Sequence, residues 1–263
     1  MNVKDFNYSP LYMTLLSLST FIPIPKLYAI KTMSVVFDFI AAALFYRIVR
    51  TLGESREKAT VVAIIMLALP TVVINASMWG QCDIIYTACF LWSFLAIIRK
   101  QPARCMIAFG FAASLKPQAI FWTPLLAGLL LAGKLPWRFL LLPLWIYAVC
   151  GLPEIVAGRS WVDVMLHWAR VENIPGLTLN AANWYQWIPE NSPAPFAWLG
   201  MALTTGFSVL MAWRMVRIKG EMENPKRLLP LVMLSLLLPP FLLPGMHERY
   251  YFPADVFALL YAV

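Results

Sequence analysis

Charged side chains are scarce in this sequence of 263 residues, of which only 13% are Asp, Glu, Lys or Arg. Soluble domains usually carry about 25% charged residues. Hydrophobic residues, by contrast, make up 61% of the chain, and the mean hydropathy is +0.70. This combination argues against a soluble domain and is typical of a polytopic membrane protein.

Paired cysteines and a signal peptide are also missing. The four cysteines include no C-x-x-C pair and mostly lie in apolar runs, so neither a disulfide framework nor a metal knuckle is expected. Residues 1–10 lack the basic start and the cleavage site of a signal peptide. The net charge of +8 comes from short Lys/Arg clusters between apolar segments, which indicates contact with membrane lipids and argues against nucleic acid as a partner.

Apolar runs suited to helices recur along the whole chain. They cover residues 27–49, 59–77, 84–98, 103–115, 117–133, 137–157, 196–213, 228–243 and 250–263. We therefore predict an all-α, polytopic integral membrane helical bundle of about nine spans, forming a single domain over residues 1–263. Several runs are shorter than a full span, and Lys116-Pro117 divides two of them. Short broken helices are tolerated where they line a cavity, so we expect a cavity here.

Basic residues gather in alternate connections between these runs. The clusters lie at Arg47–Lys58, Arg99–Arg104, Lys134–Arg138 and Arg214–Arg227, and in each of them basic residues outnumber acidic ones. The positive-inside rule places these four connections in the cytoplasm. The intervening connections are then extracytoplasmic, namely residues 1–26, 78–83, 116–117, 158–195 and 244–249.

The longest extracytoplasmic connection, residues 158–195, contains a predicted amphipathic helix. Its apolar residues recur at intervals of three and four, at Trp161, Val164, Met165, Trp168 and Val171. Its polar residues Asp163, His167 and Arg170 fall elsewhere around the helix. This pattern is typical of a helix that lies in the membrane interface.

Polar residues that are unusual in an apolar chain collect on the predicted extracytoplasmic side. They are Asp5, Asn75, Trp79, Gln81, Asp83, Lys116, Gln118, Asn180, Asn183, Trp184, Tyr185, His247, Glu248, Arg249 and Tyr250. The cationic ones are donors suited to phosphate oxygens. The carboxylates suit a general base or a divalent cation, and the aromatic rings suit a sugar. We therefore predict a site for a lipid-phosphate-linked sugar.

Structural interpretations of the same residues stay open. Asp83 fits the start of a helix, where a carboxylate interacts favourably with the helix dipole. Lys116 could extend to the lipid headgroups. Glu248 and Arg249 could neutralise each other in a tight loop, and no role is assigned to Asp38 within the first long apolar run.

Five ordered motifs carry a resemblance to a known family. They are Asp5-Phe6-Asn7-Tyr8-Ser9-Pro10, Asn75-x-x-x-Trp79-Gly80-Gln81-x-Asp83-x-x-Tyr86, Lys116-Pro117-Gln118-Ala119, Leu179-Asn180-x-x-Asn183 and Met246-His247-Glu248-Arg249-Tyr250. Their order and spacing resemble bacterial mannosyltransferase-like membrane proteins, relatives of the second mannosyltransferase of GPI-anchor assembly in the GT-C superfamily. The resemblance implies a GT-C-like fold whose cavity faces the extracytoplasmic side.

The same resemblance implies an activity and a site. The activity is transfer of a hexose, mannose first, from a polyprenyl- or dolichyl-phosphate donor to a lipid-linked or glycan acceptor, outside a bacterial plasma membrane. Asp5 and Asp83 would be the catalytic carboxylates, and Mg²⁺ or Mn²⁺ is the candidate cofactor. The donor phosphate would be held by Lys116, His247 and Arg249. The substrate cavity would be lined by Asn75, Trp79, Gln81, Gln118, Asn180, Asn183, Tyr185, Glu248 and Tyr250.

One departure from the family pattern concerns the N-terminus. Family members carry their catalytic Asp early in the first extracytoplasmic loop, whereas Asp5 matches the end of that loop. We therefore expect the chain to be a fragment whose first span and general base lie upstream of Met1. The end of its last span is expected to be missing as well.

Two alternatives to an active enzyme remain. A transporter or flippase for a lipid-linked or anionic solute would also use broken helices and intramembrane charges. It should show two similar halves, whereas the sequence has a single Lys-Pro break and no internal symmetry. The other alternative is an inactive relative that retains the motifs without turnover.

Overall fold

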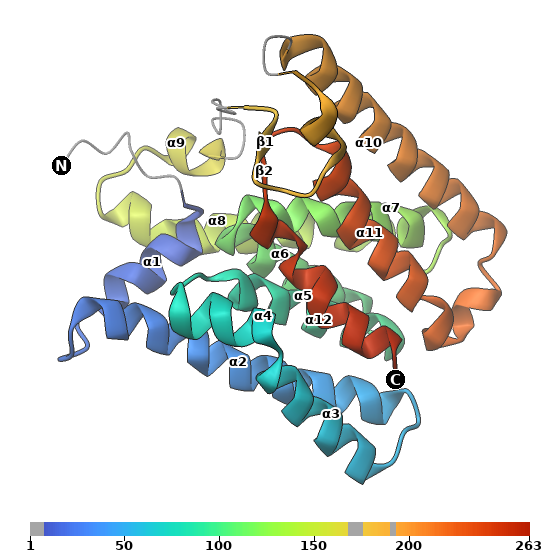
Figure 1. The fold of residues 1–263 in the computed structure, drawn as a ribbon, viewed down its shortest axis with the longest axis horizontal. Helices are drawn as coiled ribbons and strands as arrows, with labels where there is room; N and C mark the ends of the chain where they lie inside the picture. Colours follow the sequence, from blue (N-terminus) through green and yellow to red (C-terminus); the bar gives the residue numbers. More distant parts are fainter. Residues whose placement is uncertain (1–7, 168–175, 190–192) are drawn as a thin grey trace. The chain divides into compact units, whose positions relative to one another are not determined.

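A computed structural model describes residues 8–167, 176–189 and 193–263 (Figure 1). Its regular structure is almost entirely helical, which confirms the predicted all-α fold class. The helices form two compact units. Unit 1 comprises residues 1–120 and 138–172, and unit 2 comprises residues 121–137 and 173–263.

Unit 1 holds most of the helices. They are α1 (Pro10–Ser19), α2 (Lys26–Thr51), α3 (Arg56–Ala68), α4 (Pro70–Val73), the π-helical turn η2 (Ile74–Met78), α5 (Asp83–Ile98), α6 (Pro102–Leu115), α8 (Leu141–Val156) and α9 (Trp161–Met165). Helix α5 is the centre of this unit, because it packs against both α2 and α6 and buries most of its residues. Its nearly uninterrupted apolar sequence is what a helix enclosed on all sides requires.

The predicted apolar runs are helical, but fewer of them than predicted are long enough to span a membrane. Among the described residues, four helices qualify, Lys26–Thr51, Trp137–Val156, Pro195–Arg217 and Pro225–Leu242. The bent pair Arg56–Ala68 and Pro70–Met78 makes a fifth if it counts as one span. Three further apolar helices have only 10–17 residues, Asp83–Ile98, Pro102–Leu115 and Pro117–Leu131. Pro102 and Pro117 interrupt the apolar sequence between these three short helices. Each helix therefore falls short of the roughly 20 residues of a full span.

Residues 1–26, predicted to be an extracytoplasmic loop, contain a helix. Helix α1 starts with Pro10 at its first position, where the missing N–H costs nothing. Its residues contact α2, α6 and α8, and Tyr12 is buried. Residues 10–19 are therefore a packed part of unit 1 and not a free extracytoplasmic loop.

A bend of 49° separates α3 from the segment Pro70–Met78. Pro70 has no N–H to donate to the carbonyl of Met66, so the helical ladder breaks there. The chain continues through α4 into the π-helical turn η2, which contains Asn75. Such turns are rare and occur frequently at functional sites.

The predicted amphipathic helix is shorter than its apolar pattern suggested. Helix α9 ends at Met165, and Trp168, Arg170 and Val171 lie outside the described residues. Val164 is fully buried against α8, at the position where Gly151 has no side chain, and its carbonyl accepts a hydrogen bond of 3.2 Å from the Tyr147 hydroxyl. His167, predicted on the polar side, is also buried. The segment is thus docked on α8.

The described part of unit 2 contains four α-helices and one pair of short strands. They are α7 (Thr123–Leu131), α10 (Pro193–Arg217), α11 (Leu229–Leu242), β1 (Thr178–Leu179) and β2 (Met246–His247), followed by the 3-10 turn η9 (Glu248–Tyr251) and α12 (Phe252–Tyr261). Helix α7 packs against α10 and α11, and α11 packs against α12. Further 3-10 turns are η6 (Trp184–Trp187), η7 (Glu221–Glu223) and η8 (Pro225–Arg227).

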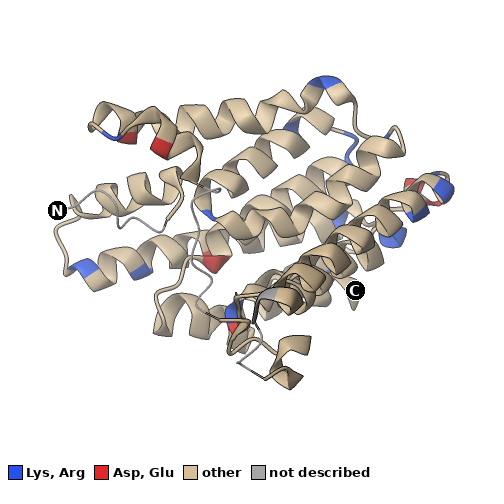
Figure 2. Cartoon of the chain, turned by 90° about the horizontal axis from the view of Figure 1, so that it is seen from above, with Lys and Arg blue, Asp and Glu red and all other residues tan. Residues whose placement is uncertain are grey.

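In unit 1, connections predicted on the same side of the membrane meet each other. Beyond the end of α5, Arg99 donates to the hydroxyl of Thr51 at 3.2 Å, which joins two basic connections. At the start of α5, residues of the 78–83 and 116–117 connections meet around Asp83. Figure 2 shows where the charged residues lie along the helices. The two ends of α5 are about 24 Å apart, at 1.5 Å for each of its 16 residues.

In unit 2, too, connections that are predicted on the same side of the membrane meet each other. Lys134 and Glu223 form an ion pair between the two basic connections of this unit. Near the other end of α11, strands β1 and β2 pair in parallel, with Thr178 opposite Met246. They join the 158–195 and 244–249 connections, both predicted to be extracytoplasmic. Within each unit, the connections therefore group as the alternating charge pattern predicts.

Candidate functional site

Asp83 in unit 1 is fully buried, with an exposed fraction of 0%. It occupies the first position of α5, where unpaired N–H groups and the helix dipole stabilise a negative charge. Gly80 has a φ of +65°, a conformation that favours glycine, and it allows the chain to turn sharply before the helix. Thr87, one turn into α5, donates to the backbone carbonyl of Asp83 at 2.6 Å.

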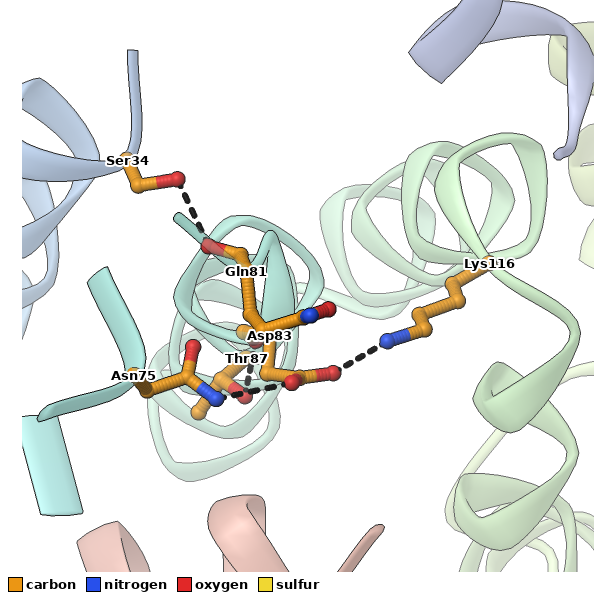
Figure 3. Close-up of polar contacts among 6 residues, drawn as sticks. All are labelled: Ser34, Asn75, Gln81, Asp83, Thr87 and Lys116. Atoms are coloured by element: carbon orange, nitrogen blue, oxygen red, sulfur yellow. Dashed lines mark hydrogen bonds and ion pairs between the residues drawn. The ribbon is translucent and has the colours of Figure 1, made fainter. Parts of the chain in front are cut away.

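Two side chains from separate elements meet the Asp83 carboxylate (Figure 3). Asn75 of η2 donates from Nδ2 to Oδ2 at 2.8 Å. Lys116 Nζ forms an ion pair with Oδ1. Lys116 is the C-cap of α6 and has an extended backbone, because Pro117 disfavours helical geometry in the preceding residue. Asn75, Asp83 and Lys116, here called the buried triad, thus come from three segments that the sequence analysis had singled out.

The buried triad decides between two interpretations of Lys116. Its side chain is only 6% exposed and points to Asp83, so it does not extend to the lipid headgroups as a surface lysine would. The ammonium also lies 5.5 Å from the ring centroid of Tyr86, within the range of a cation–π contact. A charge at this depth is stable only because its partner neutralises it.

Two buried amide oxygens, one in the triad and one two residues after Lys116, have no hydrogen-bond partner among the described residues. They are Oδ1 of Asn75 and Oε1 of Gln118. A buried carbonyl oxygen without a donor costs about 1–3 kcal/mol, a cost usually tolerated where a ligand or water supplies the donor. Both are suited to accept from a hydroxyl group, the group that a sugar offers in greatest number.

In unit 2, the strand pair positions the His247-Glu248-Arg249 segment. Leu179 lies opposite His247, and Asn180 forms a further bridge to His247. Asn180 has a φ of +65°, which asparagine tolerates better than most residues. The Asn180 motif and the His247 motif, both predicted on the extracytoplasmic side, are therefore joined through their backbones.

Arg249 is the cation of this segment that is available to a ligand. Its guanidinium carbon lies 5.7 Å from the ring centroid of Tyr250, and its Nε is buried without a hydrogen-bond acceptor among the described residues. The structure shows no ion pair between Glu248 and Arg249 in its described part, so mutual neutralisation is not what it shows. Glu248 instead lies 4.0 Å from His247 Nδ1.

Asn183 and Tyr185, predicted to line the substrate cavity, are both buried in unit 2. The Tyr185 hydroxyl donates to the carbonyl of Leu242 at 2.9 Å and fixes the loop against the end of α11. Neither amide atom of Asn183 has a hydrogen-bond partner among the described residues. Tyr185 thus has a structural contact, whereas Asn183 keeps its hydrogen-bonding capacity.

Comparison with known proteins now decides the class of molecule. The model of glycosyltransferase family 87 matches residues 6–240. The chain belongs to glycosyltransferase family 87. No curated protein and no solved structure matches it significantly. As a family 87 glycosyltransferase with membrane-spanning helices, it acts on a sugar donor and an acceptor.

Two predictions about the N-terminus of this family 87 chain lie outside the described residues. Asp5, predicted as a catalytic carboxylate, precedes residue 8, at which the described part begins. Met1, upstream of which the first span and the general base were expected, also precedes it. The match to the family model starts at residue 6 and so includes neither residue. Both assignments therefore remain predictions.

The other residues that the sequence analysis singled out in unit 1 differ in their exposure. The Trp79 side chain is 55% exposed at the end of η2. Gln81 enters the site through its backbone, since its carbonyl accepts a hydrogen bond of 2.7 Å from the Ser34 hydroxyl. Asp38 is buried in α2, and its Oδ1 has no hydrogen-bond partner in the described part of the chain.

A divalent cation has no evident site in the described residues. They contain no group of three or more His, Cys, Asp or Glu side chains placed to hold a metal. The Asp83 carboxylate already has a partner at each oxygen. The prediction of Mg²⁺ or Mn²⁺ as cofactor therefore gains no support from these residues and remains a prediction.

The sequence analysis did not identify Ser34 and Thr87. Their hydroxyls donate hydrogen bonds to the backbone carbonyls of Gln81 and Asp83, at the start of α5. Thr87 is four residues after Asp83, the spacing at which a hydroxyl reaches the carbonyl of the preceding turn. Ser34 is separated from Gln81 by 47 residues and resembles any small residue in an apolar helix. The one sequence feature that could have pointed to Ser34 is Asp38, which lies four residues later on the same buried face of α2.

Proposed function

We propose that this family 87 protein transfers a hexose, mannose first, from a polyprenyl- or dolichyl-phosphate donor to a lipid-linked or glycan acceptor. The reaction takes place at the extracytoplasmic face of a bacterial plasma membrane. The observation that carries the proposal is the buried triad, a polar cluster enclosed in an apolar helical unit. Buried charges of this kind in membrane proteins mark functional sites more often than structural ones.

The grouping of the connections supports this face. Within each unit, the basic connections meet one another and the connections with the proposed site residues meet one another. Because short basic connections usually stay in the cytoplasm, this grouping supports an extracytoplasmic position for the site residues. A donor at that side must be carried by a lipid, which supports a polyprenyl-phosphate sugar over a soluble sugar nucleotide.

Arg249 and His247 hold the donor phosphate in this proposal. The β1–β2 pairing fixes the backbone at His247, and Arg249 follows two residues later in η9. Arg249 has no carboxylate partner among the described residues, so its charge is available to an anion. A guanidinium presents paired donors that match two phosphate oxygens.

Lys116 and Asp83 act as a charge-neutral pair in the absence of substrate. Each charge of this pair offsets the other in the apolar interior of unit 1. Asp83 is engaged at both oxygens, which favours Asp5 over Asp83 as the general base in this proposal. Asn75 and Gln118 accept from sugar hydroxyls through their unpaired oxygens.

A transfer assay in membrane vesicles tests the proposal. Vesicles containing the protein receive polyprenyl-phosphate-mannose, polyprenyl-phosphate-glucose, GDP-mannose or UDP-glucose in separate reactions, and the labelled product is measured. We expect transfer from a polyprenyl-phosphate hexose, with more product from the mannose donor. Transfer from a sugar nucleotide alone would overturn the donor assignment. Flux of a lipid-linked solute without transfer would support the transporter alternative instead.

Arg249→Gln is the informative variant in this assay. It should raise KM for the lipid donor about tenfold or more, since an Arg–phosphate contact is charge-assisted and contributes roughly 1.5–3 kcal/mol. Arg249→Lys should recover only part of the loss, because a lysine lacks the paired donors. Arg217→Gln, at the opposite end of α10 from the predicted extracytoplasmic loop, removes the same charge and should leave KM unchanged.

A further inference from the structure

A cavity lies within unit 1, apart from the buried triad. It has a volume of about 520 Å³, within the usual range for ligand sites. Its walls come from α1, α2, α5 and α6, and most of them are apolar, including Leu15, Ile40, Leu44, Trp92 and Phe111. Asn75, Asp83 and Lys116 do not belong to its lining, so it is distinct from the proposed sugar site.

The polar lining of this cavity is cationic. Arg47 near the end of α2, Arg99 after α5 and Arg104 in the first turn of α6 all line it, together with Gln101. Among the described residues, the lining contains no Asp or Glu, and the three arginines form no ion pair with a carboxylate. An anion placed here would therefore meet three uncompensated charges.

Two of the three guanidinium groups are already held in position. Arg99 donates from Nε and Nη2 to the Thr51 hydroxyl at 3.3 and 3.2 Å. Arg104 donates from Nη1 to Gln101 Oε1 at 3.0 Å. Because both partners are neutral, these contacts restrict the side chains without cancelling their charge. Such preorganisation lowers the entropic cost of binding an anion.

The apolar walls extend in the same direction from each arginine. Along α2 the lining runs from Arg47 back to Phe37, along α5 from Arg99 back to Ala88, and along α6 from Arg104 forward to Leu115. Ten or eleven residues at 1.5 Å each give about 15 Å of apolar wall on all three helices. The cavity is therefore amphipathic, with a cationic mouth at one end and an apolar channel behind it.

We propose that this cavity binds a membrane lipid with an anionic phosphate headgroup, whose hydrocarbon chain lies along α2, α5 and α6. The arginines belong to the basic connections, so the headgroup comes from the cytoplasmic leaflet, whose anionic lipids attract basic segments. Free phosphate could bind the arginines at the mouth but would leave the apolar channel empty, whereas each methylene of a hydrocarbon chain buried there adds to the affinity. The proposal does not rest on the proposed sugar transfer.

Native mass spectrometry of the purified protein in detergent tests this site. The probes are phosphatidylglycerol and phosphatidylcholine with identical acyl chains, and inorganic phosphate as the headgroup alone. We expect tighter binding of phosphatidylglycerol, weakened roughly fivefold for each arginine removed in Arg47→Gln, Arg99→Gln and Arg104→Gln. Phosphate should not compete at millimolar concentration.

The matched control removes the same charge at positions outside the lining. Arg50→Gln, Arg214→Gln and Arg217→Gln lie in the basic connections of residues 47–58 and 214–227 and do not contact the cavity. The combined control variant should bind phosphatidylglycerol as the unmodified protein does. An equal loss in both triple variants would overturn the proposal, because the attraction would then be a general effect of surface charge.

A channel variant tests the hydrocarbon part and guards against misfolding. Leu44→Trp adds bulk to the cavity wall at a partly exposed position and leaves every arginine in place. We expect it to displace the bound lipid while circular dichroism and size-exclusion profiles stay unchanged. Unaltered lipid binding in this variant, or equal affinity for the two lipids in the unmodified protein, would overturn the assignment.

Discussion

Asn75 and Asp83 are joined by a side-chain hydrogen bond of 2.8 Å that closes the turn between η2 and α5. The contact links the broken helix after Pro70 to the centre of unit 1. Lys116 adds the opposite charge from the end of α6. The turn at the end of the bent span is thus held by polar groups, and its geometry depends on all three residues of the buried triad.

The ion pair of Asp83 and Lys116 should be strongly coupled. Asp83→Asn or Lys116→Gln alone leaves a buried charge without its partner, which costs about 3–5 kcal/mol. The double variant should be less destabilised than the sum of the single variants, because no unpaired charge remains. Denaturant unfolding of the four proteins in detergent micelles measures the coupling.

An exposed ion pair of unit 2 provides the control for this cycle. Lys134 and Glu223 are 32% and 51% exposed at their side chains. Exposed pairs contribute about 0–1 kcal/mol, so Lys134→Gln and Glu223→Gln should behave almost additively. A coupling at Asp83 and Lys116 as small as in this control would show that the triad is not buried as described.

Two glycines of α10 should respond in opposite directions to alanine. A Cβ on Gly200 would overlap with the Tyr185 hydroxyl and the Leu242 carbonyl, so Gly200→Ala should destabilise the protein by about 1–3 kcal/mol. A Cβ on Gly206 meets nothing within 4 Å, so Gly206→Ala should be neutral or stabilising by up to about 1 kcal/mol. Thermal unfolding compares the two variants directly.

His167 should make unfolding dependent on pH. Its pKa lies below the usual value because burial disfavours the charged ring, and Arg159 adds repulsion. The unfolded chain therefore takes up a proton near pH 6.5, before the folded chain does. Stability is complete above that pH and is lost as the pH falls toward the lower pKa of the folded state.

The comparison with His167→Gln isolates this contribution. The chain has two histidines, and His247 is unchanged in the variant. The difference in free energy of unfolding between the two proteins should vary with pH below about 6.5 and stay constant above it. A difference that is flat across pH 5 to 8 would contradict the burial of His167.

Labelling of single cysteines tests the side on which each end of unit 2 lies. Trp187 in the loop after β1 is 81% exposed, and Gly220 after α10 has open space around its Cβ position. In intact cells, Trp187→Cys should react with a membrane-impermeant maleimide and Gly220→Cys should react only after permeabilisation. The four native cysteines are buried and give the background signal. The reverse pattern would invert the assigned orientation.

Much of the fold was predictable because apolar segment length and charge alternation are properties of short sequence stretches. Helix α1 was missed, since ten residues between polar neighbours resemble a loop until their packing against α8 is known. The number of full spans was overestimated for a related reason. Runs interrupted at Pro102 and Pro117 are apolar enough to span, but their helices are too short.

The sequence analysis had singled out the members of the buried triad, but their contacts were less predictable. The residue types around Asp83 and Lys116 are rare in apolar helices, so the sequence identified them. That the two charges neutralise each other depends on the extended backbone of Lys116 and on the turn at Gly80, which arise from tertiary geometry. The role of Ser34 depends on a contact across 47 residues and has no local signal.

The parallel pairing of β1 with β2 has a consequence for evolution and engineering. Two residues on each side carry the whole ladder, so an insertion of one residue at Met246 would turn His247 to the opposite face, and an insertion at Thr178 would do the same to Leu179. The lengths of both flanking segments are therefore constrained even where their side chains are replaceable. Tolerance to substitution combined with intolerance to insertion is the mutational signature expected here.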